Sequence, residues 1–418
     1  MLHSPDLLTS VRARFANVDT CPLTGERIFF ENAGGALTLR SVVRTTARFA
    51  AIPDNQGRDN PMSKELVRLI DKAKADARLL LNAPDGHIFV GESGTEVTFR
   101  LIRSACIAAP EGGVVLSSTL EHPASRSAAA HWAEQTGRKH IVVEHDDATG
   151  TVGPEAYRAA LSPEVRVATI IHTSPVTGMG VDVAAIAAEI RAVSPDCLIF
   201  VDGIQHAAHG HIDIQSYGVD AYAISPYKMF SRHGYGLGWV SDRLTNLPHE
   251  NLRGGPEAAW EMGTRDTGAY VTLSDVVIYL DWLGGEVSDE TDPRARIEAA
   301  AKAIHDHEKD LTDAMINGTG NFKGLKDYEG LHIIGGPDNP AREGLVSCWV
   351  DKMPTADLVS ALNDRGIRTH IRKADHYSGN ILKPLGQPDC VRISLCHYNS
   401  EQEIARLLEA MQEILAGR

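Results

Sequence analysis

The stretch DAYAISPYKMFSRHGYGLGWV (220–240) decides how the rest of the chain is interpreted. It opens with the apolar run AYAI, which is typical of a short buried strand, and passes through Ser225, Pro226 and Tyr227 to Lys228. A lysine at the end of a core strand needs an explanation, because an ammonium group buried without a partner costs several kcal/mol. The sequence therefore indicates a specific use for Lys228.

Apolar strands and amphipathic helices alternate through the middle of the chain. Strands are expected at 87–90, 112–118, 140–145, 165–172 and 197–202, and helices at 95–109, 123–135 and 183–193. The run VRVATIIH (165–172) is continuously apolar, as expected for a strand buried on both faces. This alternation predicts a parallel sheet covered by helices.

The pattern changes after residue 240. Two consecutive helices are expected at 271–283 and 295–315, followed by short strands and a last amphipathic helix. At 418 residues the chain is long for one core, so two domains are expected. We predict an N-terminal segment, 1–30, that packs with the small domain, a large α/β domain, 31–290, and a small α+β domain, 291–418.

The composition excludes several classes of partner. The formal net charge is −14 and there is no long basic run, which argues against nucleic acid and anionic membranes. The six cysteines are scattered without a CxxC pair, which favours reduced structural thiols. The N-terminus lacks a secretory apolar core, and no segment approaches the ~18 apolar residues of a membrane span. We expect a cytoplasmic protein.

Polar residues stand where several expected strands end, and ligands bind at that edge of open α/β sheets. Asp202 follows CLIFV, His122 follows VVLSSTLE and Lys228 follows AYAI with three residues between. Ser93-Gly94-Thr95 opens a helix, where free N–H groups and the helix dipole favour a phosphate.

These residues carry a family resemblance. The run VDGIQHAAHGHIDI (201–214), followed by SPYK (225–228), closely resembles pyridoxal-phosphate enzymes of the class V aminotransferase group. That group includes cysteine desulfurases, selenocysteine lyases and isopenicillin N epimerase-like proteins. The resemblance extends from FFENAGG (29–35) to VRISLCHYNSEQEI (391–404). It implies the pyridoxal-phosphate-dependent transferase fold (fold type I), an α/β fold with a mainly parallel central sheet in the large domain and a smaller α+β C-terminal domain.

The resemblance assigns catalytic roles. Lys228 is expected to form the Schiff base with pyridoxal 5'-phosphate and then to act as the general base at the substrate Cα. Asp202 is expected to hold the pyridinium N–H, and His122 to stack on the ring. Gln205 matches the position that hydrogen-bonds the phenolic oxygen of the cofactor.

Further positions match phosphate and substrate contacts. The expected phosphate contacts are Ser93, Gly94, Thr95, Ser225, Tyr227 and Thr264. Thr264 matches a threonine that reaches the phosphate across a subunit boundary, which implies a homodimer with active sites at the interface. Arg392 matches the arginine that holds the substrate α-carboxylate through two hydrogen bonds. Tyr377 and Ser378 lie in the expected lid, RKADHYSGNIL (372–382), and are expected to contact substrate.

Four departures from desulfurases limit what is carried over. Ser378 stands at the position of the lid cysteine, and a serine hydroxyl cannot accept sulfane sulfur as a persulfide. Pro175 stands where an asparagine is usual, and Tyr227 replaces a histidine. The run Ser231-Arg232-His233 replaces a Gly-Pro turn, and the role of Arg232 and His233 is left open. The spacing in HAAHGH (206–211) matches no common zinc pattern, so no metal is expected.

The leading hypothesis is a pyridoxal-phosphate enzyme that acts on a small amino acid through an external aldimine and Cα deprotonation. Aminotransferase or lyase chemistry is favoured, and epimerisation stays open. Activity like that of cysteine desulfurases or selenocysteine lyases is disfavoured by Ser378. A non-catalytic binding protein is disfavoured because Lys228, Asp202 and Arg392 are all present. A nucleotide-dependent oxidoreductase is weaker still, because no GxGxxG follows an early strand.

Overall fold

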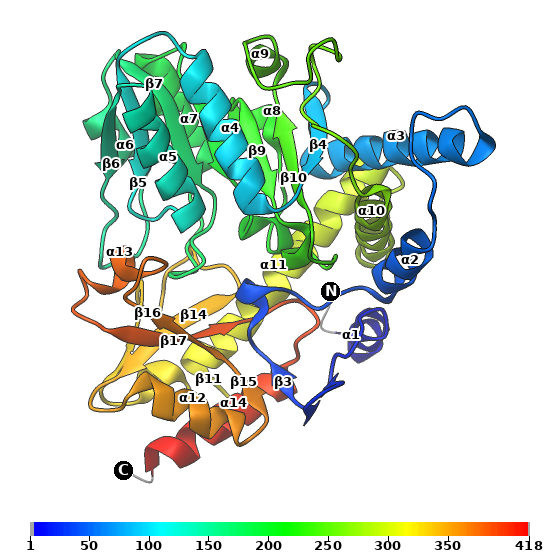
Figure 1. Ribbon diagram of the computed structural model, residues 1–418. Coiled ribbons are helices and arrows are strands. Elements are labelled where there is room, and N and C mark those ends of the chain that lie inside the picture. The colour runs from blue at the N-terminus through cyan, green and yellow to red at the C-terminus, as the bar shows by residue number, and fades with distance from the viewer. Residues whose placement is uncertain (1–3, 417–418) are drawn as a thin grey trace.

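The computed structural model describes residues 4–416. Figure 1 shows a central sheet between helices and, beside it, a smaller sheet built by the C-terminal part of the chain. The seven strands of the central sheet lie in the following order: β4 (His87–Gly91), β10 (Gly236–Val240), β9 (Ala221–Ile224), β8 (Leu198–Asp202), β7 (Val165–Ile171), β5 (Val114–Ser118), β6 (Lys139–Val143). Only β10 runs antiparallel to its neighbours, so the sheet is mainly parallel, as predicted.

Strand β8 shows how the sheet separates two cores. Leu198 and Phe200 pack on one face with α4 (Gly94–Ala108) and α5 (Pro123–Gln135). Ile199 and Val201 pack on the other face with α7 (Val183–Val193) and α10 (Thr267–Val287). Successive side chains of a strand point to opposite faces, so a wholly apolar strand is needed to fill both cores.

The smaller sheet has the order β13 (Leu331–Ile333), β14 (Leu345–Val350), β17 (Asp389–Ser394), β16 (His370–Lys373), and all its pairs are antiparallel. Helices α12 (Thr355–Asn363) and α14 (Glu401–Ala416) pack on it. Helix α11 (Pro293–Asn317) joins the two parts, because Ile297 and Ile304 lie in the large core and Leu311 and Met315 in the small one.

The N-terminal segment contacts the C-terminal part of the chain. Strand β3 (Ile28–Phe29) pairs in parallel with β15 (Ile367–Arg368), and Phe30 is buried in the small core. These contacts agree with the expected packing of the segment, while the boundaries at residues 31 and 291 stay predictions. The other elements are α1 (Pro5–Arg12), β1 (Thr20–Cys21), β2 (Gly25–Glu26), α2 (Arg40–Ala50), α3 (Pro61–Leu81), α6 (Pro154–Ala160), α8 (Ile214–Tyr217), α9 (Asp242–Thr245), β11 (Gly318–Thr319), β12 (Phe322–Lys323) and α13 (Gly379–Leu382).

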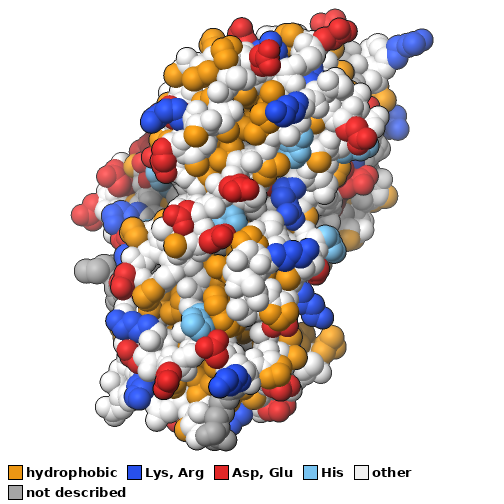
Figure 2. All heavy atoms as spheres, turned by 90° about the vertical axis from the view of Figure 1, so that its left-hand side faces the viewer, with side chains coloured by type: hydrophobic (Ala, Val, Ile, Leu, Met, Phe, Trp, Pro, Cys, Tyr) orange, Lys and Arg blue, Asp and Glu red, His pale blue; other side chains and the backbone are white. Residues whose placement is uncertain are grey.

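The surface agrees with the charge pattern of the sequence. On the face shown in Figure 2, acidic and basic side chains are interspersed and no continuous basic stripe is visible. Among residues 4–416, no helix combines the length and apolarity that a membrane crossing requires.

Candidate active site

Lys228 lies just beyond the carboxyl end of β9, at the edge of the sheet where the neighbouring β8 ends in Asp202. Its backbone N–H donates to Ser225 O at 2.9 Å, which closes a tight 3₁₀ turn over Pro226–Lys228. The lysine is only 9% exposed, and its Nζ donates to Gln205 Oε1 at 3.2 Å. The turn therefore holds the lysine at the edge where ligands bind.

The electrostatic surroundings make Lys228 a weak base for a lysine. Burial lowers its pKa to about 7, and the nearby guanidinium of Arg392 adds to this effect. The charge of Asp202 raises the pKa of Lys228, and the charge of Arg372 makes a further, smaller contribution that lowers it. A large share of Lys228 is therefore uncharged amine near neutral pH, which is the form that attacks a carbonyl or takes a proton.

Asp202 is held rigidly by two donors. Ser125 Oγ donates to its Oδ2 at 3.1 Å, and the backbone N–H of Ile204 donates to its Oδ1 at 3.1 Å. The side chain is buried and, within the described residues, forms no salt bridge. Burial raises its pKa, although both hydrogen bonds and Lys228 oppose the shift. A buried carboxylate in this position lacks a cationic partner, and a protonated ring nitrogen would supply one.

His122 is the N-cap of α5, and its Nδ1 accepts a hydrogen bond from Ala124 N at 3.2 Å. Burial, with smaller contributions from Lys228 and two arginines, lowers its pKa to about 3. The ring is therefore neutral, which suits stacking on a cationic heterocycle. The adjacent Glu121 is buried, and burial together with Asp202 raises its pKa to about 8.

A cradle for an anion lies at the N-terminus of α4. Ser93 is the N-cap, and its Oγ accepts from Glu96 N at 3.1 Å, so the first N–H groups of the helix remain for a ligand. A Cβ at Gly94 would collide with Ser225 Oγ, and a Cβ at Gly236 would collide with the backbone of Ser93 and Gly94. Glycines are therefore required at both positions by the close approach of these neighbouring atoms. Thr95, which was also expected here, is exposed.

Two arginines of the small sheet complete the site. Arg392 on β17 is 3% exposed and donates from Nη1 to Pro175 O at 3.0 Å, while its Nε has no partner within the described chain. Burial and, to a smaller extent, the charge of Arg372 lower the pKa of Arg392 to about 9. Arg372 on β16 donates from Nε to Ser378 Oγ at 2.9 Å. A buried cation with an unused donor is suited to an incoming carboxylate.

The segment 372–382, here called the lid segment, rests on the large domain. His376 O accepts from Arg126 Nη2 at 2.6 Å, and Asn380 donates to Thr119 O. Tyr377 is 43% exposed, and its ring centroid lies 6.2 Å from that of His122. Ser378 is fully buried. The lid segment therefore brings Tyr377 toward the edge of the site and turns Ser378 inward.

Some expected contacts are not formed within the chain. Thr264 is exposed, and its Oγ1 accepts from Asn55 Nδ2 at 3.3 Å. The ring of Tyr227 stacks on His233, with centroids 4.3 Å apart. Arg232 pairs with Asp266. The role of Thr264 in phosphate binding therefore stays a prediction, and the structure adds an ion pair with Asp266 for Arg232, whose role the sequence did not indicate.

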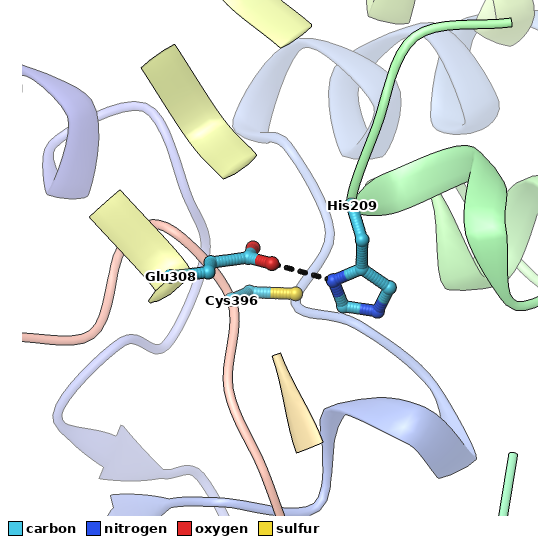
Figure 3. Close-up of side chains that lie close together, drawn as sticks. All are labelled: His209, Glu308 and Cys396. Atoms are coloured by element: carbon cyan, nitrogen blue, oxygen red, sulfur yellow. Dashed lines mark hydrogen bonds and ion pairs between the residues drawn. The ribbon is translucent and has the colours of Figure 1, made fainter. Parts of the chain in front are cut away.

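Sequence reasoning missed two features. Arg372 was expected only as part of the lid segment, yet its charge acts on Lys228 and Arg392. Figure 3 shows the second feature, in which His209, Glu308 and Cys396 point toward one another from three separate elements. The signal for His209 was its place one helical turn after Gln205, while nothing in the local sequence marks Glu308.

The fold and the family comparison together define a pyridoxal-phosphate-dependent enzyme of fold type I. The chain belongs to the class V aminotransferase family, whose model matches residues 28–284 and 296–407. It is 27% identical over 407 residues to a probable cysteine desulfurase of Xylella fastidiosa (strain 9a5c), covering 93% of this chain and 90% of that protein. It is 25% identical over 427 residues to the aminotransferase-like protein FGM3 of Gibberella zeae, covering 99% of this chain and 100% of that protein.

Solved structures share the fold. The cysteine desulfurase CsdA of Escherichia coli matches with a TM-score of 0.78 at 21% identity, covering 98% of each chain. The apo cysteine desulfurase of Thermococcus onnurineus NA1 matches with a TM-score of 0.81 at 19% identity, covering 96% of this chain and 98% of that one.

The residues present fit the family's cofactor. Asp202 offers a buried carboxylate without a salt bridge among the described residues. The Ser93–Gly94 turn offers the first N–H groups of α4 to an anion, and Lys228 offers a buried amine whose pKa is lowered to about 7. Pyridoxal 5'-phosphate carries a ring nitrogen, a phosphate and an aldehyde, which are the three complementary groups.

Proposed function

We propose that the protein deprotonates a small amino acid at Cα and carries out aminotransferase or lyase chemistry. The observation that carries this proposal is the burial of Lys228 at the sheet edge where β8 ends in Asp202, with its Nζ 3.2 Å from Gln205 Oε1. Burial and the charge of Arg392 lower its pKa to about 7, which agrees with a role as a base. Pyridoxal phosphate, when bound, supplies an electron sink for the carbanion. Every other part of the chemistry falls to groups of the chain.

Each residue has a separate task in this proposal. Lys228 holds the cofactor and afterwards takes the proton from the substrate Cα. Asp202, fixed by Ser125 and Ile204, keeps the ring nitrogen protonated. Arg392 binds the α-carboxylate and thereby orients the Cα–H bond toward Lys228.

A desulfurase reaction through a protein persulfide is not part of the proposal, although relatives carry that name. Such a reaction needs an accessible thiolate near the substrate. Ser378 is buried and bonded to Arg372. Cys390, which lies on β17 with Arg392, is also buried, and burial raises its pKa to about 12.

The second arginine bears on the substrate class. Burial lowers the pKa of both Arg372 and Arg392, and the charge of Arg372 also lowers that of Arg392. Neither arginine forms a salt bridge within the described residues. Two such cations at one site favour a substrate with a second anionic group beside its α-carboxylate. Replacing Arg372 with Gln should lower kcat/KM for L-aspartate or L-glutamate at least about tenfold relative to L-alanine, because a charged hydrogen bond of about 1.5 kcal/mol or more is lost.

The cofactor assignment is tested by reduction with borohydride, which should fix the mass of the cofactor on the peptide that contains Lys228. A label on another lysine, or a Lys228→Ala protein that borohydride still links covalently to the cofactor, would refute the assignment. The reaction is tested in deuterated water with L- and D-amino acids. A 2-oxo acid product indicates transamination, ammonia with loss of a β-substituent indicates elimination, and the enantiomer indicates epimerisation.

Arg392→Ala should reduce Cα–H exchange about 10- to 150-fold, because a desolvated charge-assisted pair contributes roughly 1.5–3 kcal/mol. If amines without a carboxylate exchange and amino acids do not, Arg392 does not bind the carboxylate and the proposed substrate class is wrong.

A further inference from the structure

A line of buried side chains runs from Lys228 away from the sheet edge to helix α11. Lys228 Nζ lies 3.2 Å from Gln205 Oε1, and Gln205 Nε2 lies 3.1 Å from His209 Nε2. His209 Nδ1 in turn lies 2.6 Å from Glu308 Oε2, the contact drawn in Figure 3. All four residues are at most 9% exposed. Water is therefore a poor substitute for any partner in this line.

The direction of every hydrogen bond in the line follows from the charge of Lys228. An ammonium group only donates, so it requires the amide oxygen of Gln205. The amide NH₂ then faces His209, whose Nε2 must accept, so the histidine is neutral and donates from Nδ1 to Glu308. This is the arrangement that the distances describe.

The opposite direction is equally consistent when Lys228 carries no charge. The amide of Gln205 then turns its N–H toward the lysine side, and its oxygen faces His209. His209 must then donate from Nε2 to this oxygen. With Glu308 as a carboxylate, which only accepts, His209 also donates from Nδ1 and is an imidazolium. The two arrangements hold the same number of protons, one on Lys228 and the other on His209.

The charges around His209 permit this second arrangement. Burial lowers the pKa of His209, but the carboxylate of Glu308, by charge and by hydrogen bond, outweighs burial and leaves the pKa raised. The other titratable groups that act on His209 or lie beside it are Glu343, Lys228, His206, His397 and Cys396. Burial raises the pKa of Cys396 far above the ordinary value, so this thiol adds no charge.

The same cluster is not assigned to a metal. Ligand atoms of His209, Glu308 and Cys396 lie within 4.8 Å of one another. However, both ring nitrogens of His209 take part in hydrogen bonds, Nδ1 with Glu308 and Nε2 with Gln205, and the line of hydrogen bonds accounts for the cluster without an ion.

We propose that His209 and Glu308 are positioning residues that set the orientation of the Gln205 amide, and that they turn its N–H toward the cofactor once Lys228 is no longer an ammonium. The inference rests on the proposed function and on the expectation, from the family resemblance, that Gln205 faces the phenolic oxygen of the cofactor. An anionic oxygen requires a donor, and Gln205 presents one only if His209 donates to its carbonyl. The line of hydrogen bonds thus links the charge of Lys228 to the group, N–H or carbonyl oxygen, that Gln205 presents to the cofactor.

The test is an optical titration of the cofactor-loaded protein. A hydrogen bond to the phenolic oxygen stabilises the more negative form of the chromophore, so its loss raises the pH midpoint of the visible absorption band. Glu308→Gln removes the carboxylate and with it the second proton, and so the positive charge, of His209. The net charge of the pair is unchanged, but the neutral imidazole no longer has to donate to Gln205. The midpoint should rise by about one pH unit.

The chain offers a matched control. Glu343 also pairs with a buried histidine, because His206 Nδ1 lies 3.0 Å from its Oε1, but this pair makes no hydrogen bond to Gln205 among the described contacts. Because Glu343 acts on His209 only through its charge, Glu343→Gln should shift the midpoint much less than Glu308→Gln. Equal shifts in both variants, or no shift in Glu308→Gln, would overturn the proposal.

A second variant covers the case in which Glu308→Gln does not fold. The double variant His209→Leu/Glu308→Leu removes both members and leaves no unpaired buried charge, a change that proteins often tolerate. Its midpoint should rise by the same amount, and an unchanged midpoint would contradict the role of the pair. If the unmodified protein gains no visible band with pyridoxal phosphate, the proposed function fails, and this inference fails with it because Gln205 then has no phenolic oxygen to meet.

Discussion

At the scale of single residues, the strongest tension lies between stability and function at Lys228. The side chain is buried, and its pKa falls from 10.5 to about 7 because the charged form is poorly solvated. The unfolded chain, with a lysine pKa of about 10.4, binds this proton over a range where the folded protein does not. The lysine therefore destabilises the cofactor-free fold, as is common for groups kept for catalysis.

Lys228→Met should consequently stabilise the cofactor-free protein by about 1–4 kcal/mol at neutral pH. Because the pKa is lower in the folded state, the destabilisation is absent above the unfolded pKa and grows as the pH falls toward about 7. Denaturant unfolding at pH values near 7 and near 10 measures the difference. A Met variant that is less stable than the parent at neutral pH would show that the lysine is well accommodated as an ammonium.

Asp202 provides a prediction about the cofactor. Its carboxylate accepts hydrogen bonds from Ser125 Oγ and Ile204 N–H, and it forms no salt bridge with a residue of the described chain. Asp202→Ala should weaken cofactor binding and remove most activity, whereas Ser125→Ala, which keeps the carboxylate, should have a smaller effect. Equilibrium dialysis with pyridoxal phosphate ranks the variants. Equal affinity of Asp202→Ala and the parent would remove Asp202 from the site.

At the scale of elements, the lid segment differs from a mobile loop that delivers a nucleophile. Ser378 is fully buried and bonded to Arg372, and the lid segment is tied to the large domain through Arg126 and Thr119. The hydroxyl is therefore both chemically unsuited to accept sulfur and turned away from solvent.

We expect no efficient persulfide formation from L-cysteine. A protein persulfide that turns over at roughly 1 per second or more would contradict this expectation. Sulfide released by direct β-elimination is compatible with it, because that route needs no protein thiol. Alkylation of the denatured protein followed by mass spectrometry distinguishes the two routes. Ser378→Cys serves as a comparison, and its burial should keep that thiol unreactive as well.

The elements show which features a sequence carries locally. Helices α5 and α7 match the expected bounds, and β7 differs by one residue, because apolar periodicity and the buried apolar run mark them directly. Strand β10 is not marked, since GLGWV contains two glycines that weaken strand propensity. Gly238 is needed there because Phe89 packs against it. Helix α3, which begins after the Asn60 cap, is likewise absent from the expected elements.

The same distinction holds for the candidate site. Lys228, Asp202 and Gln205 stand in one short motif, so their proximity follows from the order of adjacent parallel strands. Arg372 and Glu308 come from β16 and α11, and their approach depends on how the two parts of the chain pack. No local pattern marks such residues, because their roles arise from contacts between distant segments.

At the scale of the whole molecule, the loop that carries Thr264 bears on whether two subunits share an active site. Arg265 Nη1 lies 3.7 Å from Glu92 Oε1, so the loop runs close to the residue that precedes Ser93. Yet Thr264 is exposed, and within residues 4–416 the hydrogen bond of its side chain is the one from Asn55 Nδ2 to Oγ1. We propose that in a homodimer this threonine reaches the phosphate bound by the partner subunit.

Mixed dimers test this arrangement. Thr264→Glu places a carboxylate beside the phosphate and should weaken cofactor binding at least about tenfold through like-charge repulsion. Lys228→Ala and Thr264→Glu should each be inactive, but subunits mixed after mild dissociation should recover about one quarter of the parent activity. Half of the dimers are then mixed, and one site in each combines the intact Lys228 of one subunit with the intact Thr264 of the other. Mixing Lys228→Ala with the double variant should recover nothing. Inactive mixtures of variants that are dimeric by sedimentation, or a parent protein that is monomeric, would place Thr264 outside the partner's site.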